Sequence, residues 1–206
     1  MSYSKISQKL GIPKSTLHYW FRNLRWSLRI KKELARKMLF IAKRRLQLLN
    51  KAREEKWIKW HERCRKTAMK EFPHIKKNPL FLAGLMLYWG EGDSKIENSN
   101  VRLSNTNPEM IKIFSRFLRR ICHIPRKKIK IHLFLYPDLK ERVSKQFWSK
   151  ISGIPKNQFV KTQFIRGKHP TRRLANGICT LQVGSRELKE KIFTWIKLYQ
   201  RELLRV

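Results

Sequence analysis

The first apolar side chains recur at helical spacing in two short segments of residues 3–24. The apolar positions concerned are Ile6, Leu10, Leu17 and Trp20. Between the segments, Gly11 supplies the positive φ of a tight turn, and Pro13 prevents the first helix from continuing. The pair Ser15-Thr16 is suited to cap the second helix. The pattern therefore predicts two helices joined by a tight turn.

The small and apolar residues of this segment match the buried positions of a known DNA-binding motif. They are Ile6, Ser7, Leu10, Gly11, Ile12, Leu17 and Trp20. On these positions, residues 1–26 resemble the helix-turn-helix family, which implies that the second helix enters the major groove of DNA. Four outward side chains would then contact base edges, namely Lys14, Ser15, His18 and Tyr19. Two more, Arg22 and Arg25, would contact phosphates. The alternative is a helical hairpin used only for packing.

Residues 27–77 form a basic segment, with neither Gly nor Pro from Leu28 to Phe72. Apolar residues recur there in steps of three and four, at Leu34, Met38, Ile41, Leu48 and Ala52. The pattern is interrupted at Arg45. This predicts one long helix or a pair of helices. Trp57 and Trp60 alternate with basic residues, which suits either stacking on exposed bases or packing on a partner helix, and packing is the commoner role. A hinge between Pro73 and Pro79 is expected to separate this connector from a third domain, 78–206.

Residues 80–94 predict an apolar helix that has small residues on one side and a carboxylate at its end. Its stripe consists of Ala83, Gly84, Leu87 and Gly90. Small side chains allow a second helix to approach closely, so we expect this stripe to form a helix–helix seam. Glu91 follows on the same stripe, where Gly92 can end the helix.

Two pieces of this segment, Leu82-Ala83-Gly84-Leu85 and Gly90-Glu91-Gly92, resemble the signature of the LAGLIDADG homing endonucleases. The spacing departs from that signature by two residues, and the acidic end is the one that the stripe supports independently. The resemblance implies that two such helices pack side by side and that each terminal acid holds a divalent cation over DNA. It therefore implies Mg²⁺ at Glu91, assisted by Asp93. Because the chain has one such signature, cleavage of both strands would require a homodimer through this helix.

The remainder of the third domain alternates between strand and helix patterns. Strands are predicted at Val101–Ser104, Arg126–Leu133 and Ile178–Val183, and amphipathic helices start at Asn107 and Arg186. An internal repeat with an offset of 30 residues matches 117–125 to 147–155, each copy giving a helix, an Ile-Pro turn and a strand. The fold class predicted is α+β, with helices packed on a mostly antiparallel sheet.

Polar side chains on the predicted strands are candidates for contact with nucleic acid. Lys128, Lys130 and His132 share one face of their strand, and Ile129, Ile131 and Leu133 share the other. Lys130 or Gln182 would steady the attacking water of an endonuclease. A basic loop adds further candidates for phosphate contact, namely Arg166, Lys168, Arg172 and Arg173, although a solvated loop would have the same composition.

Charge narrows the class of partner. The chain has 49 Lys and Arg against 14 Asp and Glu, a net charge of +35 on 206 residues. Residues 1–76 carry 22 − 5 = +17 and residues 77–206 carry 27 − 9 = +18, so both halves favour a polyanion. The cysteines Cys64, Cys122 and Cys179 form no CxxC pair, and the longest apolar run is too short to span a bilayer. We expect a cytoplasmic, nucleoid-associated protein with neither a membrane partner nor a small-molecule substrate.

Three functions from different classes fit these features. The first is a sequence-specific, Mg²⁺-dependent DNA endonuclease in which Glu91 holds the metal. The second is a transcription regulator that binds DNA on the same scaffold without cleaving it. The third is an RNA-binding splicing factor, against which the helix-turn-helix argues because A-form RNA hides its major groove.

Overall fold

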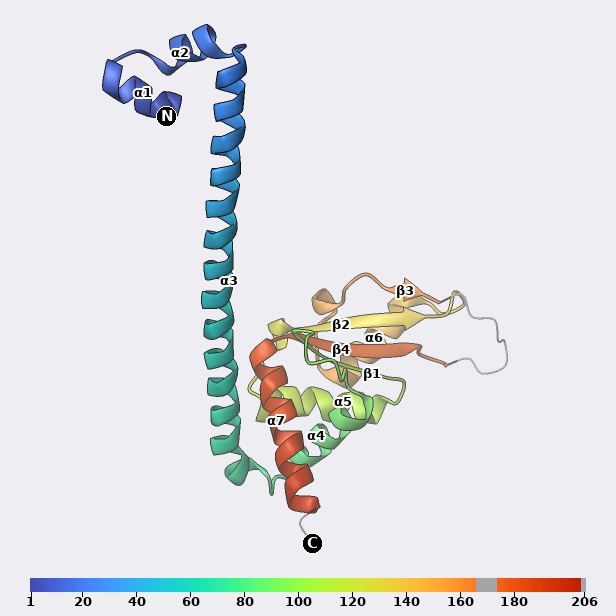
Figure 1. Cartoon of the computed structure of the whole chain (residues 1–206). Coiled ribbons are helices and arrows are strands. Elements are labelled where there is room, and N and C mark those ends of the chain that lie inside the picture. The colour runs from blue at the N-terminus through green and yellow to red at the C-terminus, as the bar shows by residue number, and fades with distance from the viewer. Residues whose placement is uncertain (166–173, 205–206) are drawn as a thin grey trace. The chain divides into compact units, whose positions relative to one another are not determined.

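A computed structural model describes residues 1–165 and 174–204 (Figure 1). The chain divides into two compact units, Met1–Lys59 and Trp60–Val206. The N-terminal unit contains α1 (Tyr3–Leu10), α2 (Lys14–Phe21) and the first part of α3 (Arg25–Ile75), which continues into the second unit. None of the helices in the described ranges is both long enough and apolar enough to cross a membrane.

The first two helices form where the sequence predicts them. Ser2 caps α1 by accepting a hydrogen bond from the Lys5 N–H, and Gly11 ends it at a φ of +70°. Pro13 occupies the N-cap of α2, so the expectation that Ser15 and Thr16 cap this helix is wrong, and both lie in its first turn.

Fewer side chains are buried in this unit than the helix-turn-helix resemblance implies. Leu17 is buried, whereas Leu10, Gly11 and Trp20 are exposed, so the expectation for these three residues is wrong. Leu17 is the one buried side chain of α1 and α2, which contact each other. The Trp20 ring lies edge-on to Phe21 at the surface.

The basic connector is a single helix, α3, as one of the two interpretations predicted. In the second unit it buries Cys64, Ala68 and Phe72, which follow one another at four-residue spacing on one face. The Trp195 indole N–H donates to the Ala68 carbonyl oxygen at 3.1 Å, which fastens this part of α3 to α7 (Arg186–Leu203).

The second unit has the predicted α+β architecture. Its other helices are α4 (Pro79–Glu91), α5 (Pro108–Arg116), which continues as the π-helical turn η1 (Phe117–Ile121), and α6 (Glu141–Ser152). The strands are β1 (Asn100–Asn105), β2 (Ile129–Leu135), β3 (Gln163–Phe164) and β4 (Ile178–Gly184). The strand order is β1-β4-β2-β3, antiparallel except for the β2–β3 pair.

One face of the sheet carries the core of this unit, and α4, α5 and α7 pack on that side (Figure 1). The buried strand residues alternate with polar ones, as predicted: they include Val101, Leu103, Ile129, Ile131, Leu133, Cys179, Leu181 and Val183. Both copies of the internal repeat give a helix, an Ile-Pro turn with a short 3₁₀ helix (Arg126–Lys128 and Lys156–Gln158), and a strand. Their strands, β2 and β3, are parallel neighbours.

Candidate nucleic-acid interface

The outer face of α2 presents a row of basic and hydrogen-bonding side chains. All the residues expected there are exposed: Lys14, Ser15, His18, Tyr19 and Arg22, with Arg25 just beyond the helix. Lys14, His18 and Arg22 follow at four-residue spacing, so they share one face, and the buried Leu17 lies beside it. His18 and Arg22 lie at the inner edge of this face, because both line the neighbouring pocket and the His18 ring lies edge-on to Tyr3 of α1. The Arg22 guanidinium lies 5.3 Å from the centre of the Tyr19 ring, an arrangement that stiffens both side chains.

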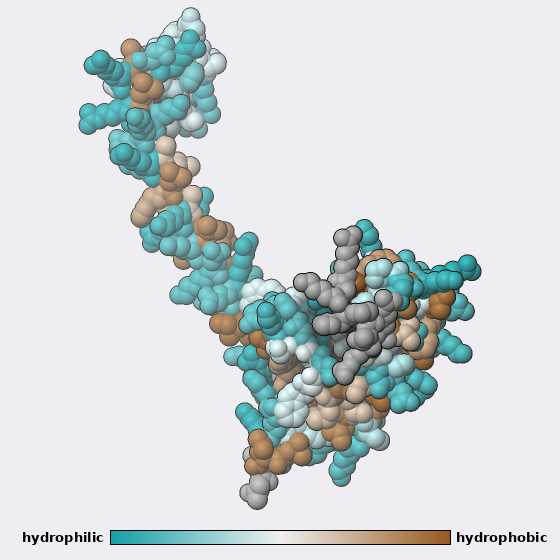
Figure 2. All heavy atoms as spheres, turned by 90° about the vertical axis from the view of Figure 1, so that its right-hand side faces the viewer, coloured by the Kyte–Doolittle hydropathy of each residue, from teal (hydrophilic) through white to brown (hydrophobic). Residues whose placement is uncertain are grey.

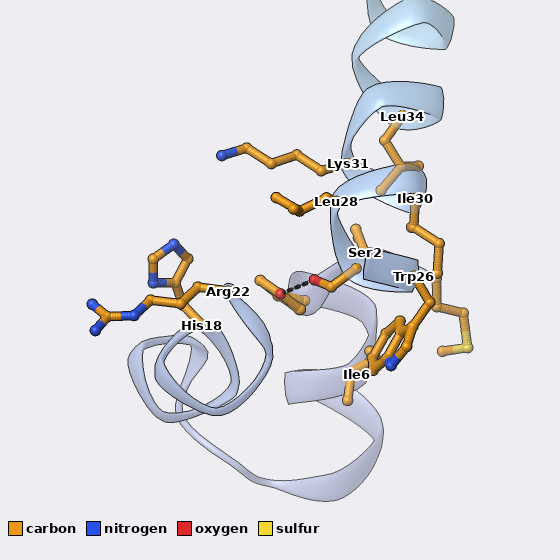
Figure 3. Close-up of a pocket in the computed structure, with 12 residues that line it drawn as sticks. Ser2, Ile6, His18, Arg22, Trp26, Leu28, Ile30, Lys31 and Leu34 are labelled. Carbon is orange, nitrogen blue, oxygen red and sulfur yellow. Dashed lines mark hydrogen bonds between the residues drawn. The ribbon is translucent and has the colours of Figure 1, made fainter. Parts of the chain in front are cut away.

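A pocket of about 520 Å³ lies between α1, α2 and the start of α3 (Figure 3). Ile6, Trp26, Ile30 and Leu34 are among its apolar walls, and His18, Arg22 and Lys31 also line it. Tyr3 and Ser27 line the pocket as well, and their hydroxyl groups are 2.6 Å apart and hydrogen-bonded, which connects α1 to α3. The pocket shows that apolar surface remains uncovered where the three helices meet.

The face of the sheet opposite the core carries polar side chains in two rows. Arg102, Gln182 and Lys130 are register partners on β1, β4 and β2, and Arg102 donates to the Gln182 side-chain oxygen at 3.1 Å. The next row consists of Ser104, Thr180 and His132, in which the hydroxyl groups of Ser104 and Thr180 lie 2.7 Å apart and Thr180 is buried. We call these six residues the polar face of the sheet.

Charge on the polar face is positive, and its histidine is neutral at pH 7. Arg102 and Lys130 are exposed. Lys128 is exposed too, but it lies in the 3₁₀ turn before β2, so the expectation that it shares a strand face with Lys130 and His132 is wrong. Burial, together with the charge of Arg102, lowers the pKa of His132 from its ordinary value of 6.5. A neutral imidazole has both a donor and an acceptor nitrogen, so His132 can bond to base or sugar groups as well as to phosphate.

Glu91 is exposed at the end of α4, beside the edge of the sheet. The next residue, Gly92, bridges to Leu103 of β1, and the Asp93 N–H donates to the Arg102 carbonyl oxygen at 3.0 Å. Glu91 thus lies on the outer side of β1, the edge strand that carries Arg102. Because β1 and β4 intervene, Lys130 is roughly 14 Å away, three strand spacings. The structure places Lys130 beside Gln182 but not beside the Glu91 of the same chain.

Asp93, the second expected metal ligand, is engaged by protein groups. Its carboxylate accepts from the Lys95 N–H at 3.0 Å and from the Asn98 amide at 2.8 Å, and it pairs with Lys189 at 3.4 Å. Burial alone would raise the pKa of Asp93, but these hydrogen bonds and the Lys189 charge together lower it. Within the described ranges, no group of three or more His, Cys, Asp and Glu side chains is placed to share a metal ion.

The expected seam of α4 divides between the core and the surface. Gly84 is buried against Phe117, and a Cβ atom built there would lie 2.2 Å from that ring. Ala83 and Leu87 are half-buried, and Gly90 is exposed with open space around it. The small residue at position 84 therefore serves a close approach within the chain.

Sequence reasoning missed Arg102, which completes the first row of the polar face. The signal was present, since Val101 and Leu103 point to the core and Arg102 must then point outward. The basic-loop residues Arg166, Lys168, Arg172 and Arg173 lie outside the described residues.

No protein-family model, curated protein or solved structure matches this chain. The helix-turn-helix and LAGLIDADG interpretations therefore stay predictions. The exposed face of α2 and the polar face of the sheet are the observations from which a function can be inferred.

Proposed function

We propose that this chain is a sequence-specific binder of double-stranded DNA, with α2 as its reading element. The observation that carries the proposal is the exposed face of α2, on which Lys14, Ser15, His18 and Arg22 stand together without an acidic neighbour on that helix. A helix of this width fits the major groove, where each base pair offers a distinct pattern of donors and acceptors. Ser15 and His18 would read bases, and Arg22 and Arg25 would hold phosphates.

The charge distribution supports binding by both units. Residues 1–59 carry 17 Lys and Arg against 3 Asp and Glu. In the second unit, the polar face of the sheet offers Arg102 and Lys130 beside neutral hydrogen-bonding groups. Duplex DNA is favoured over duplex RNA because the deep, narrow major groove of A-form RNA excludes a helix.

A second candidate function, Mg²⁺-dependent cleavage of the bound DNA, is favoured by the position of Glu91. Its carboxylate is exposed beside the edge strand of the sheet, whereas Asp93 is held by Lys189 and two hydrogen bonds. One carboxylate per chain suits Mg²⁺, which often takes one or two protein ligands and completes its shell with water and phosphate oxygens. The ion, when bound, would supply an activated water.

Cleavage of both strands would need a Glu91 from each of two chains. The side of α4 available for such a homodimer includes Leu82, Trp89 and Gly90, which are exposed. Gln182 and Lys130 lie two and three strand spacings from the Glu91 of their own chain, so they would contact the DNA backbone and not the attacking water.

The proposal is tested by incubating the protein with a randomised duplex library, with and without Mg²⁺, and sequencing both the bound duplexes and the DNA ends. We expect a recurrent motif among bound duplexes, altered by Ser15→Ala or His18→Ala. A set of bound duplexes with no enriched motif would contradict sequence-specific binding. Paired breaks that vanish with Glu91→Gln, while binding persists, would support cleavage. Binding without breaks would leave a non-catalytic regulator. If the protein binds a randomised RNA library in preference to the duplexes, both functions are excluded.

A further inference from the structure

The N-terminal unit leaves most of its apolar side chains uncovered. In residues 1–59, all of which the structure describes, only Leu17 and Ser27 are buried. Sixteen of the exposed large apolar side chains in the described residues belong to this unit, and seven belong to the much larger second unit. Every residue from 35 to 59 is exposed. Most of the stability of a helix in a protein comes from packing of its apolar face, so a partner is expected here.

Part of the apolar surface of α3 forms a continuous stripe. It consists of Leu34, Met38, Leu39, Ile41, Leu46, Leu48 and Leu49, which we call the α3 stripe. These positions occupy one half of the helix circumference, since each residue turns the helix by about 100°. Figure 2 shows apolar side chains in brown at the surface of this part of α3, among hydrophilic ones in teal. Leu34 also lines the pocket of Figure 3, so the stripe begins where the three N-terminal helices meet.

The charges around the stripe limit what can cover it. Residues 34–52 contain six Lys and Arg and no Asp or Glu, and five of the six lie off the stripe; Arg45 is the exception. The stripe itself is therefore apolar and nearly uncharged, and it fits a surface of the same kind. The same stripe of a second copy is such a surface, and a two-fold axis would make the pair self-complementary.

The area is of the size that a stable dimer needs. Each large side chain of the stripe would lose on the order of 100 Å² of exposed apolar surface. With the alanines and the Lys and Arg stems beside them, each copy would bury roughly 700–900 Å², close to the 800 Å² or so per partner of standard interfaces.

We infer that the α3 stripe is the docking surface for the same stripe of a second copy of this chain. This dimer goes beyond the proposed function and does not depend on it, because it forms without DNA. The dimer would carry two copies of α2. Dimeric helix-turn-helix proteins use two such helices to read two half-sites of DNA. Because both copies are strongly basic, the dimer tightens as salt screens their repulsion, whereas DNA binding weakens with salt.

The chain offers a matched control on the opposite side of α3. Leu49 lies nine residues, two and a half turns, from both Phe40 and Ile58, so these two residues share the face away from the stripe. Met38 and Leu49 are 66% and 56% exposed, and Phe40 and Ile58 are 70% and 52% exposed. The test pair Met38→Ser/Leu49→Ser and the control pair Phe40→Ser/Ile58→Ser thus remove similar apolar surface from opposite faces.

The test is sedimentation equilibrium of the full chain without DNA, from 0.1 to 1 M NaCl, with far-UV circular dichroism to check that helix content is retained. We expect a mass of twice 25.0 kDa for the wild type, with self-association strengthened by salt. Met38→Ser/Leu49→Ser is expected to weaken the dimer by about a hundredfold or more, and the control pair by less than about threefold. A wild type that stays monomeric at high protein and salt concentration would overturn the inference. So would a dimer that both pairs leave intact and that Leu82→Ser/Trp89→Ser on α4 dissociates.

Discussion

The side-chain ammonium of Lys189, which is fully buried, lies 3.4 Å from a carboxylate oxygen of Asp93, two residues beyond the end of α4. The same ammonium donates to the Asn100 carbonyl oxygen at 3.2 Å, just where β1 begins. One lysine of α7 therefore fixes the segment that connects Glu91 to the polar face of the sheet. Because a buried charge is costly without a partner, Asp93 has a structural role that competes with metal binding.

Removal of the two partners is expected to have unequal effects. Asp93→Asn leaves the Lys189 ammonium buried without its carboxylate, so we expect the free energy of unfolding to fall by about 2–4 kcal/mol. Lys189→Met removes the buried charge itself, and Asp93 keeps its bonds from Lys95 and Asn98, so the loss should stay under about 1.5 kcal/mol. Urea unfolding followed by tryptophan fluorescence measures both, since Trp148 and Trp195 are buried in this unit. A larger loss of unfolding free energy from Lys189→Met than from Asp93→Asn would contradict the role of Asp93 as the partner of the buried Lys189 charge.

The same pair predicts a loss of stability in acid. The pKa of Asp93 in the folded protein lies below its ordinary value of 3.8, so its carboxylate stabilises the fold above that value. This contribution is lost as the pH falls through the lowered pKa, because the folded state must then take up the proton. We expect the difference in unfolding free energy between wild type and Asp93→Asn to be constant from about pH 7 to 5 and to shrink below about pH 4. A difference that stays unchanged down to pH 2.5 would show that the Asp93 charge does not stabilise the fold.

Two glycines of α4 make a matched pair with opposite expectations. In Gly84→Ala the new methyl group would overlap the Phe117 ring, and overpacking of this kind costs about 1–3 kcal/mol. In Gly90→Ala the methyl group would meet no atom within 4 Å, so the better helix propensity of Ala should stabilise the fold by up to about 1 kcal/mol.

Thermal unfolding of the two alanine variants, beside the wild type, gives the sign of each effect. Equal destabilisation by both would argue against the Gly84–Phe117 contact. A Gly90→Ala chain that is more stable as a monomer but associates less would support a role for Gly90 in the α4 dimer.

Much of the fold could be predicted because its signals are local. The Asn78-Pro79 and Asn107-Pro108 pairs start α4 and α5, and the alternation around Arg102 gives a strand with one buried face. The small residue Gly84 correctly indicated a close approach. Its partner could not be predicted, because Phe117 and a second copy of α4 would require the same small residue.

The candidate site could be predicted only in part, because it depends on the order of strands. Local alternation shows that Lys130 and Gln182 point to the same face, but it does not show that β1 and β4 separate Glu91 from Lys130. Lys189 was missed for a similar reason. A lysine in an amphipathic helix predicts a solvated side chain, and only the fold brings Asp93 close enough to compensate for its burial.

The salt dependence of DNA binding distinguishes direct phosphate contacts from general positive charge. Each phosphate contact that is lost lowers the slope of log K against log salt by about 0.9 for duplex DNA. We therefore expect Arg22→Ala on α2 and Lys130→Ala on the polar face each to reduce the slope by about one, with little change in sequence preference. Lys112→Ala is the matched control for Lys130→Ala, because Lys112 is also exposed but lies on α5, on the core side of the sheet.

Fluorescence anisotropy with a labelled duplex, from about 50 to 200 mM NaCl, covers the range over which such slopes are measured. If Lys112→Ala lowers the slope as much as Lys130→Ala, the polar face is not the contact surface and the second unit binds DNA by net charge alone. If Arg22→Ala leaves the slope unchanged while Lys130→Ala lowers it, α2 does not lie on the backbone and the reading element must be sought in the second unit.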